Sequence, residues 1–337
     1  MKLLFYLFLF FVCFYSANSI EAKIENALVG LKEATESFTN FIQKFGKTYA
    51  TDAEKAKRFG IFRETLERIR KLNSKSKHAV FGITKFSDLS PREFLKLYTG
   101  LKPSISSRLF VNCLKLRDAD IYTDRAPNAF DWRELNKVSR VKNQGKCGSC
   151  WAFSAIGNIE SQYAIKYNEI VEFSEQQLVD CDLISNGCEG GLPSYAFKSI
   201  LRRGGLQSEK DYPYKACNRF CTFDQNKIRA KLVGCKTYDL SNEDALKEVL
   251  YDDGPLSIAV DAAGLRDYTG GILDECQLKR LNHAMLLVGY GTENGTPYWI
   301  VKNTWGTKYG ENGYVRVLRG NNTCGILNDF VGTSVLA

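Results

Sequence analysis

One cysteine and one histidine occupy positions that suit a thiol nucleophile and its base. Cys150 lies in the segment Cys-Gly-Ser-Cys-Trp-Ala-Phe-Ser and opens an apolar pattern that predicts a buried helix over residues 150–168. The positive end of a helix dipole and the free N–H groups of a first turn stabilise a thiolate. His283 is the only histidine after residue 126 and precedes an apolar run that predicts a strand. Because an imidazole can take the proton of a nearby thiol, we predict that these two residues form a catalytic pair.

Two amides and one indole complete the predicted constellation. Asn303 ends a predicted strand and can accept a hydrogen bond from the second ring nitrogen of His283, and Trp305 can shield that bond from water. Gln144 precedes Cys150 by six residues, so its side chain can donate to a developing oxyanion beside the backbone N–H of Cys150. The pattern therefore indicates nucleophilic attack on a carbonyl group.

The pair Cys147 and Cys150 has two other interpretations. A zinc site normally takes four nitrogen or sulfur ligands, but the sequence after residue 126 holds one histidine and no second pair of cysteines three residues apart. A redox dithiol would need a thioredoxin-like strand–helix–strand context, which the sequence pattern lacks. We therefore favour the nucleophile and predict no metal and no cofactor.

The N-terminus is typical of a secretory signal peptide over residues 1–19. Met1 and Lys2 precede an apolar stretch from Leu3 to Tyr15, and small or polar residues follow it. The stretch is too short to cross a bilayer as a helix, and no other segment is long and apolar enough, so we predict no membrane span. Export permits disulfides. Nine of the 11 cysteines follow residue 126, and this odd number leaves at least one thiol without an internal partner.

The length and the charge distribution indicate two parts after the signal. The 337 residues suffice for about two domains, and the apolar and charged fractions of 44% and 25% are ordinary for globular proteins. Residues 20–125 hold 21 Lys and Arg and 13 Asp and Glu, a net charge of +8, whereas residues 126–337 hold 24 and 25, a net charge of −1. No basic run is interleaved with aromatic residues, so we predict no nucleic-acid partner. The basic segment instead suits an intramolecular acidic partner.

The hydrophobic pattern predicts helices first and strands later. Residues 51–54 form a capping box, and apolar residues at spacings of three and four extend a helix to about residue 73. Residues 101–128 are polar and are interpreted as a linker, with a cleavage region near Arg125–Pro127. Beyond the helix of residues 150–168, Ser174 caps a helical segment near residues 173–179. Strands are predicted at 256–260, 284–290, 298–301 and 314–318. The predicted fold class is α+β.

The motifs resemble those of papain-like cysteine proteases, and the handful of residues that carry the resemblance is spread over nearly the whole chain. Besides the Cys150 segment, Asn-His-Ala at 282–284 and Lys-Asn-Thr-Trp-Gly at 302–306 are similar to the active-site motifs of that family. Propeptide motifs of the cathepsin L-like group are matched by Glu54, Arg58, Ile61, Phe62, Ile69, Asn73, Gly82, Phe86 and Asp88. Thr304 stands where cellular enzymes mostly have serine, which makes the chain most similar to baculovirus viral cathepsins.

The resemblance implies a papain-like fold with a helical left domain, a β-barrel-like right domain and the active site in the cleft between them. It implies a signal peptide at 1–19, an inhibitory propeptide at 20–125 and a mature cysteine peptidase at 126–337. It also implies the disulfides Cys147–Cys188, Cys181–Cys221 and Cys276–Cys324. Cys217 and Cys235 are left over: a fourth bridge between them, or competition of Cys217 with Cys221 for Cys181, stays open.

The implied substrate groove includes a pocket for the second residue before the cut. Residue-by-residue matching gives Gly190, Gly191, Leu192, Pro193, Ala259, Leu281, Ala284, Asp329 and Trp305 as substrate-binding residues. The apolar members favour Leu, Val or Phe, whereas a carboxylate from Asp329 at the bottom of the pocket would pair with Arg; the alternative is that Asp329 faces solvent. The sequons at Asn294 and Asn321 are predicted glycosylation sites.

The expected function is that of a secretory-pathway cysteine endopeptidase made as a zymogen. The viral resemblance implies degradation of host tissue proteins late in infection, with a chitinase as a possible companion. The expected partners are protein substrates and the chain's own propeptide, and a monomer is expected. The zymogen would stay in the endoplasmic reticulum, and the enzyme would act in an acidic compartment or outside the cell after lysis. The alternatives are a cellular lysosomal cathepsin L-like protease and an inactive binding or storage protein on the same fold.

Overall fold

The computed structural model describes residues 28–102, 113–276, 280–328 and 330–337, so the predicted signal peptide lies outside the described residues. The chain divides into two compact units, residues 1–70 and residues 71–337. In the first unit, residues 28–45 are helical and precede helix α2 (Asp52–Lys75), which continues into the second unit. Phe38, Phe41 and Phe62 are buried and lie 5.1–6.0 Å apart by ring centroids.

The predicted capping box at residues 51–54 starts α2. The backbone N–H of Glu54 donates to Thr51 Oγ1 over 3.1 Å, and the N–H of Ala50 donates to the carboxylate of Glu54 over 3.1 Å. These bonds satisfy N–H groups that a helix start leaves unpaired. The prediction of a helix from residue 51 to about residue 73 is therefore confirmed to within two residues.

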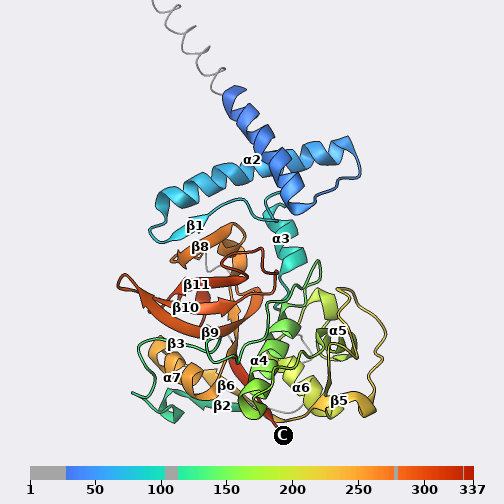
Figure 1. Cartoon of the computed structure of the whole chain (residues 1–337), viewed down its shortest axis with the longest axis vertical. Coiled ribbons are helices and arrows are strands. Elements are labelled where there is room, and N and C mark those ends of the chain that lie inside the picture. Colours follow the sequence, from blue (N-terminus) through green and yellow to red (C-terminus); the bar gives the residue numbers. More distant parts are fainter. Residues whose placement is uncertain (1–27, 103–112, 277–279, 329) are drawn as a thin grey trace, which may run out of the picture. The chain divides into compact units, whose positions relative to one another are not determined.

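The helices of the second unit cluster in its first half, apart from one. They are α3 (Pro91–Tyr98), α4 (Cys150–Tyr167), α5 (Glu175–Cys181), α6 (Pro193–Arg203) and α7 (Glu243–Asp253). The predicted cap of α5 is present, because Ser174 Oγ accepts from Gln177 N over 2.9 Å. Figure 1 shows α4, α5 and α6 close together beside the sheet. The short 3-10 turns are Asp118–Asp120, Gly187–Glu189, Gln225–Lys227, Ala262–Leu265 and Thr323–Gly325.

Among the described residues, one sheet has ten strands, with the path β1-β8-β11-β10-β9-β7-β12-β6-β2 and with β3 paired to β9. Its strands are β1 (Ala79–Phe81), β2 (Leu114–Arg117), β3 (Phe130–Asp131), β6 (Leu232–Asp239), β7 (Leu256–Val260), β8 (Tyr268–Leu273), β9 (His283–Glu293), β10 (Thr296–Lys302), β11 (Tyr314–Leu318) and β12 (Val331–Leu336). A small second sheet pairs β4 (Leu206–Gln207) with β5 (Ile228–Ala230). The four predicted strands are confirmed as β7, β9, β10 and β11.

Helix α4 joins the helical part to the sheet. Trp151, Ile156 and Ile159 are fully buried and share one apolar cluster with Ala259 of β7 and Ala284 of β9. Ser154 Oγ also donates to the carbonyl of Met285 over 2.7 Å. Protein interiors are close-packed, so these contacts fix the position of the start of α4 relative to the start of β9.

The linker predicted at residues 101–128 differs from the structure. Its second part forms strand β2, which pairs in parallel with β6 from Leu114 opposite Lys236 to Arg117 opposite Asp239. The structure contains the disulfides Cys147–Cys188, Cys181–Cys221 and Cys276–Cys324. It also contains a fourth, Cys113–Cys235, so the alternative of a bridge between Cys217 and Cys235 is wrong. Cys150 is buried and Cys217 is exposed, and both are free thiols.

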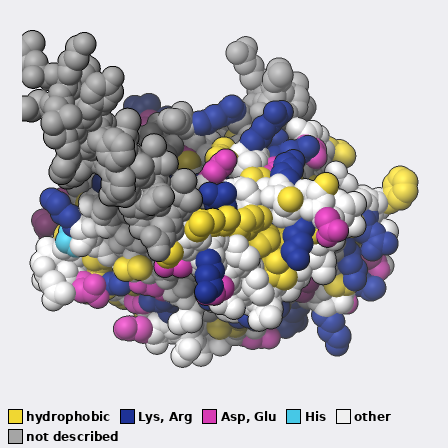
Figure 2. Space-filling view, turned by 90° about the horizontal axis from the view of Figure 1, so that it is seen from above, with side chains coloured by type: hydrophobic (Ala, Val, Ile, Leu, Met, Phe, Trp, Pro, Cys, Tyr) yellow, Lys and Arg dark blue, Asp and Glu magenta, His cyan; other side chains and the backbone are white. Residues whose placement is uncertain are grey.

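None of the described helices combines enough residues with enough apolar character to span a bilayer. On the face drawn in Figure 2, acidic and basic side chains are interspersed rather than gathered by sign.

Candidate active site

His283 is held by a hydrogen bond on one side and an aromatic ring on another. It begins β9 and is fully buried. Its Nε2 lies 2.9 Å from Oδ1 of Asn303, the residue after β10, and its ring stacks on Trp305 at 4.7 Å between centroids. The antiparallel pairing of β9 with β10 brings the two strands together. The structure thus brings together His283, Asn303 and Trp305 as the sequence predicts.

The hydrogen bonds of Asn303 decide which ring nitrogen of His283 carries the proton. The backbone N–H of Thr304 donates to Asn303 Oδ1 over 2.8 Å, so this atom is the amide oxygen. An oxygen can only accept, and therefore His283 Nε2 must donate. The other nitrogen, Nδ1, is buried without a hydrogen-bond partner among the described residues. In this tautomer Nδ1 carries a lone pair and can accept a proton.

Cys150 is the first residue of α4 and is fully buried beside the histidine strand. The backbone N–H of Ala284, which follows His283, donates to Cys150 Sγ over 3.5 Å. The preceding turn is fixed by the Cys147–Cys188 disulfide and by the hydrogen bond from Gly148 N to the carbonyl of Cys188, 2.9 Å long. The free thiol therefore lies at a helix N-terminus, in contact with the residue that follows the predicted base.

Residues 99–102 cover this thiol. The N–H groups of Gly100 and Leu101 both donate to the carbonyl of Asn282 over 3.1 and 3.0 Å. Gly191 N donates to the carbonyl of Gly100 over 2.9 Å, and Lys102 N donates to the carbonyl of Gly191 over 3.0 Å. A Cβ atom on Gly100 would lie 1.9 Å from the carbonyl oxygen of Gly148, so only glycine fits here.

The covering segment is anchored by α3 and the loop before it. Phe86 is fully buried, with its ring 5.1 Å from that of Trp305. Lys85 Nζ donates to the carbonyl of Trp305 over 2.7 Å, and Trp305 Nε1 donates to the carbonyl of Tyr98 over 3.0 Å. The indole that stacks on His283 therefore also holds the segment that covers Cys150.

Burial under this segment keeps the thiol and the imidazole neutral. It raises the pKa of Cys150 to about 12, against the lowering effect of backbone N–H donors that include those of Ala284 and Trp151. It lowers the pKa of His283 to about 4, and the hydrogen bond to Asn303 raises that pKa only in part. The sequence predicts a lowered thiol pKa, which the covered site does not have, because loss of water outweighs the helix N-terminus.

Gln144 is fully buried and lies between the Cys150 turn and the Asn303 loop. Its Nε2 donates to the carbonyl of Cys147 over 2.8 Å, its Oε1 accepts from the hydroxyl of Thr304, and its N–H donates to the carbonyl of Thr304 over 2.8 Å. Its Nε2 also donates to the carbonyl of Tyr98, the last residue of α3, over 3.3 Å. The side-chain amide is thus oriented at the site, and its Nε2 also bonds the helix that anchors the covering segment.

Tyr214 is a positioning residue that sequence reasoning missed. Its hydroxyl donates to the backbone carbonyl of Gln144 over 2.8 Å and lies 2.6 Å from Ser149 Oγ. It therefore links Gln144 to the residue directly before Cys150. Tyr214 follows Gln144 by 70 residues and Ser149 by 65, and no sequence motif marks it for this role.

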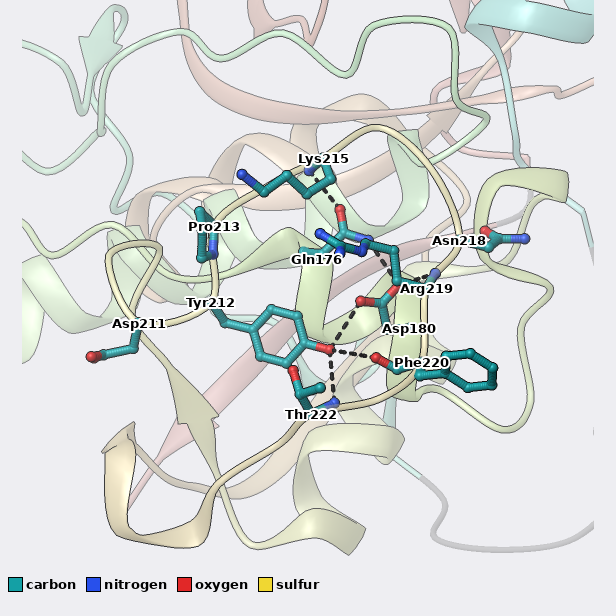
Figure 3. Close-up of a pocket in the computed structure, with 10 residues that line it drawn as sticks. All are labelled: Gln176, Asp180, Asp211, Tyr212, Pro213, Lys215, Asn218, Arg219, Phe220 and Thr222. Carbon is teal, nitrogen blue, oxygen red and sulfur yellow. Dashed lines mark hydrogen bonds between the residues drawn. The ribbon is translucent and has the colours of Figure 1, made fainter.

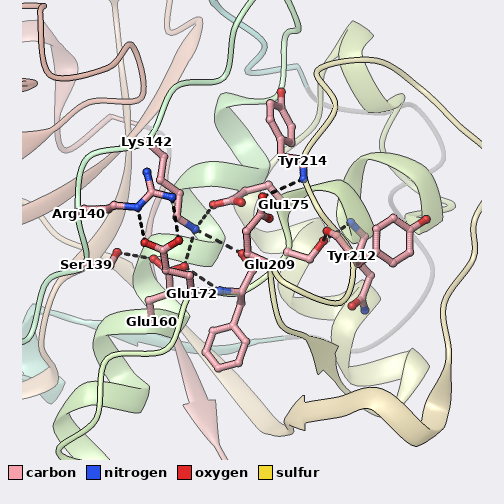
Figure 4. Close-up of polar contacts among 12 residues, drawn as sticks. Ser139, Arg140, Lys142, Glu160, Glu172, Glu175, Glu209, Tyr212 and Tyr214 are labelled. Atoms are coloured by element: carbon pink, nitrogen blue, oxygen red, sulfur yellow. Dashed lines mark hydrogen bonds and ion pairs between the residues drawn. The ribbon is translucent and has the colours of Figure 1, made fainter.

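A buried charge network behind the site was also missed (Figure 4). Lys142 Nζ lies 2.6 Å from Glu160 of α4 and 2.7 Å from Glu175 of α5, and all three side chains are at least nine-tenths buried. Lys302, the neighbour of Asn303, donates to Ser139 Oγ over 2.9 Å. Burial lowers the pKa of Lys302 to about 8, although Glu160 raises it. The network ties the segment before Gln144 to α4 and to the end of β10.

Several residues of the predicted substrate pocket share one apolar cluster. Leu192, Ala259, Leu281 and Ala284 belong to one apolar cluster with Cys150, and Phe330 joins them. Pro193 is buried in the first turn of α6, and Gly191 pairs with the covering segment. Gly190 lies at φ 124°, and a Cβ there would be 2.7 Å from the carbonyl oxygen of Gly100. Asp329 lies outside the described residues, so its prediction stays untested.

A cavity of about 550 Å³ lies elsewhere, between α5 and residues 211–222 (Figure 3). Its polar groups largely bond one another: Tyr212 donates to Asp180 over 2.9 Å, and Gln176 donates to Asp180 over 2.7 Å. It contains none of the predicted catalytic residues. Within the described ranges, no group of three or more His, Cys, Asp or Glu side chains could hold a metal ion.

Comparisons with known proteins agree with this geometry. Residues 126–333 match the family described as Papain family cysteine protease, and residues 38–94 match the Cathepsin propeptide inhibitor domain. A viral cathepsin of Lymantria dispar multicapsid nuclear polyhedrosis virus is 45% identical over 95% of this chain and 90% of its own length. A viral cathepsin of Bombyx mori nuclear polyhedrosis virus is 43% identical over 99% of both.

Solved precursors share the fold. The digestive procathepsin L2 proteinase of Tenebrio molitor larval midgut has a TM-score of 0.83 and 36% identity over 90% of this chain and 100% of that chain. A recombinant stem bromelain precursor has a TM-score of 0.79 and 34% identity over 90% and 99%. The chain belongs to the papain family of cysteine proteases and carries a cathepsin propeptide inhibitor domain.

Proposed function

We propose that Cys150 is the nucleophile of this protease and that His283 is its base. The observation that carries the proposal is the tautomer of His283: Asn303 binds the proton on Nε2, and Nδ1 is left with a free lone pair beside the helix that begins with Cys150. Transfer of the thiol proton to Nδ1 gives a thiolate and an imidazolium, each stabilised by the other. The thiolate attacks the substrate carbonyl, and the amide of Gln144 and the N–H of Cys150 stabilise the oxyanion.

The experiment that tests this mechanism uses the processed enzyme and a Phe-Arg reporter peptide. Cys150→Ser is nearly isosteric, so we expect a folded protein with no measurable hydrolysis, and the same fold for the control Cys217→Ser with unchanged hydrolysis. Hydrolysis that persists in Cys150→Ser and disappears in Cys217→Ser would identify the exposed Cys217 as the nucleophile instead.

Residues 20–125 keep the enzyme latent, and acid releases it. Residues 99–102 exclude water from Cys150, and the propeptide has a net charge of +8 against −1 for the mature part. Protonation of carboxylates weakens ion pairs as pH falls. Asp88, which is 3% exposed, is our candidate trigger. In Asp88→Asn, release should no longer need acid. An unchanged pH profile of processing in Asp88→Asn would contradict the role of Asp88 as the trigger. Full activity of the unprocessed precursor at neutral pH would refute latency.

Substrate choice follows the apolar cluster at Leu192, Ala259 and Leu281, which suits Leu, Val or Phe in the second position before the cut. We propose that Asp329 adds tolerance for Arg there. In Asp329→Ala, hydrolysis of an Arg-Arg reporter should fall while that of the Phe-Arg reporter stays. Equal effects on both reporters would reject this role.

The signal at residues 1–19 directs the chain into the secretory pathway, where disulfides form. Asn294 and Asn321 are exposed and suit glycosylation there. Similarity to viral cathepsins supports degradation of host tissue proteins late in infection. An unchanged mass after glycosidase treatment would contradict glycosylation at both asparagines. Loss of secretion in a chain lacking residues 1–19 would support entry into the secretory pathway through this signal.

A further inference from the structure

The propeptide has two parts with different places in the fold. Residues 79–102 form β1 at one edge of the large sheet and then cover Cys150. Residues 113–125 lie at the opposite edge, where β2 pairs with β6. The path of the sheet places six strands between β1 and β6. The second part therefore contacts the mature domain at the end of the sheet opposite to β1.

The second part is joined to the mature domain by a disulfide in register with the strand pairing. The partners Leu114–Lys236 and Arg117–Asp239 are both 122 residues apart, and the disulfide Cys113–Cys235 spans the same 122 residues. Cys235 is 4% exposed and lies in the apolar cluster of the helical half, against which Cys113 packs. The strand pairing and the disulfide thus fix the same alignment of β2 on β6.

Polar contacts continue along this part to the proposed cleavage region. Lys115 lies 2.7 Å from Asp239, and the carboxylate of Asp118 accepts from Ser241 N over 3.1 Å. Arg125 lies 3.0 Å from Asp252 of α7. The N–H groups of Arg125 and Ala126 both donate to one oxygen of Glu248 in α7, over 3.1 and 2.9 Å. Residues 122–125 are exposed and lack regular structure.

We propose that residues 113–125 stay on the catalytic domain after activation, held by Cys113–Cys235, while the part that covers Cys150 leaves. This rests on the proposed cleavage near Arg125–Pro127. Departure of the part that covers Cys150 also needs a second cut between Lys102 and Cys113, within the polar linker of residues 101–128. Each cut is a hydrolysis: one water molecule is consumed per peptide bond, a carboxylate and an amine form, and the disulfide Cys113–Cys235 is unchanged. The active enzyme then consists of two chains. The short chain contains Cys113 and supplies β2 as an edge strand of the large sheet.

The experiment measures the intact mass of the purified active enzyme before and after reduction. Without reduction, we expect the mass of the chain that begins near residue 126 plus the mass of a peptide containing Cys113. Reduction should remove that peptide. Tryptic digestion without reduction should give a linked pair of peptides that contain Cys113 and Cys235. Cys217→Ser is the matched control and should keep the linked pair, whereas Cys113→Ser should lose the short chain on purification.

Two results would overturn the proposal: an active enzyme that contains no Cys113 peptide before reduction, or one in which Cys235 is alkylated without reduction. The test is separate from the proposed catalytic mechanism. A Cys150→Ser precursor processed by added wild-type enzyme should show the same linked pair. If catalysis were assigned to the wrong thiol, activity would persist in Cys150→Ser while the linked pair was unaffected.

Discussion

Replacement of Gly100 by alanine should partly open the latent precursor. The new Cβ would lie 1.9 Å from the carbonyl oxygen of Gly148 and 2.4 Å from its carbon. Both neighbours are backbone atoms next to the Cys147–Cys188 disulfide, so they cannot move aside cheaply. The covering segment itself must shift by more than 1 Å from its place.

That shift acts on the four hydrogen bonds that residues 100–102 make with Asn282 and Gly191. A net loss of two bonds costs about 1–3 kcal/mol. The population with an uncovered Cys150 should then rise by about 5- to 150-fold. The assay is the rate at which an epoxide thiol inhibitor labels Cys150 in unprocessed precursor at neutral pH, with the site identified by peptide mapping.

Gly60→Ala is the matched control. Gly60 lies in α2, and a Cβ there would meet no atom within 4 Å, so the labelling rate should equal that of the wild type. A Gly100→Ala precursor that folds and labels at the wild-type rate would refute the role of residues 99–102 as the cover of the thiol.

Three further predictions address the charge states and their supports. Ultraviolet titration should detect almost no thiolate at pH 7 in the precursor, about one molecule in 10⁵ for a pKa of about 12, and a much larger fraction after processing, because water returns to Cys150; equal fractions would contradict this. Asn303→Ala should lower kcat/KM by about 5- to 150-fold with unchanged melting temperature, and Asn303→Gln should restore part of it. Lys142→Met should lower the free energy of unfolding in urea by about 3–5 kcal/mol, because Glu160 and Glu175 lose their buried partner; a loss below 1 kcal/mol would argue against the network.

The sequence predicts the elements that carry the chemistry because their signals are local. The apolar pattern after Cys150 marks α4, and short β-branched runs mark β7 and β11. The cap at Ser174 follows from two residues three apart. The spacing of cysteine, histidine and asparagine then suffices to predict the constellation.

The features that the sequence does not predict depend on distant contacts. Strand β2 reads Leu-Lys-Leu-Arg in a polar stretch, and its partner β6 lies 122 residues further on. Lys142, Glu160 and Glu175 are ordinary surface residue types until the fold buries them together. The neutral state of Cys150 arises from a segment 50 residues earlier, so a lowered thiol pKa is the wrong expectation for the covered site.

The most direct test of the catalytic assignment is to map the site of an epoxide thiol label in the processed enzyme while following hydrolysis of the Phe-Arg reporter. We predict that label accumulates on Cys150 in step with the loss of activity, and that the free thiol of Cys217 stays unlabelled. Complete inactivation with the label on Cys217, or full label on Cys150 with activity retained, would contradict the assignment of Cys150 as the nucleophile.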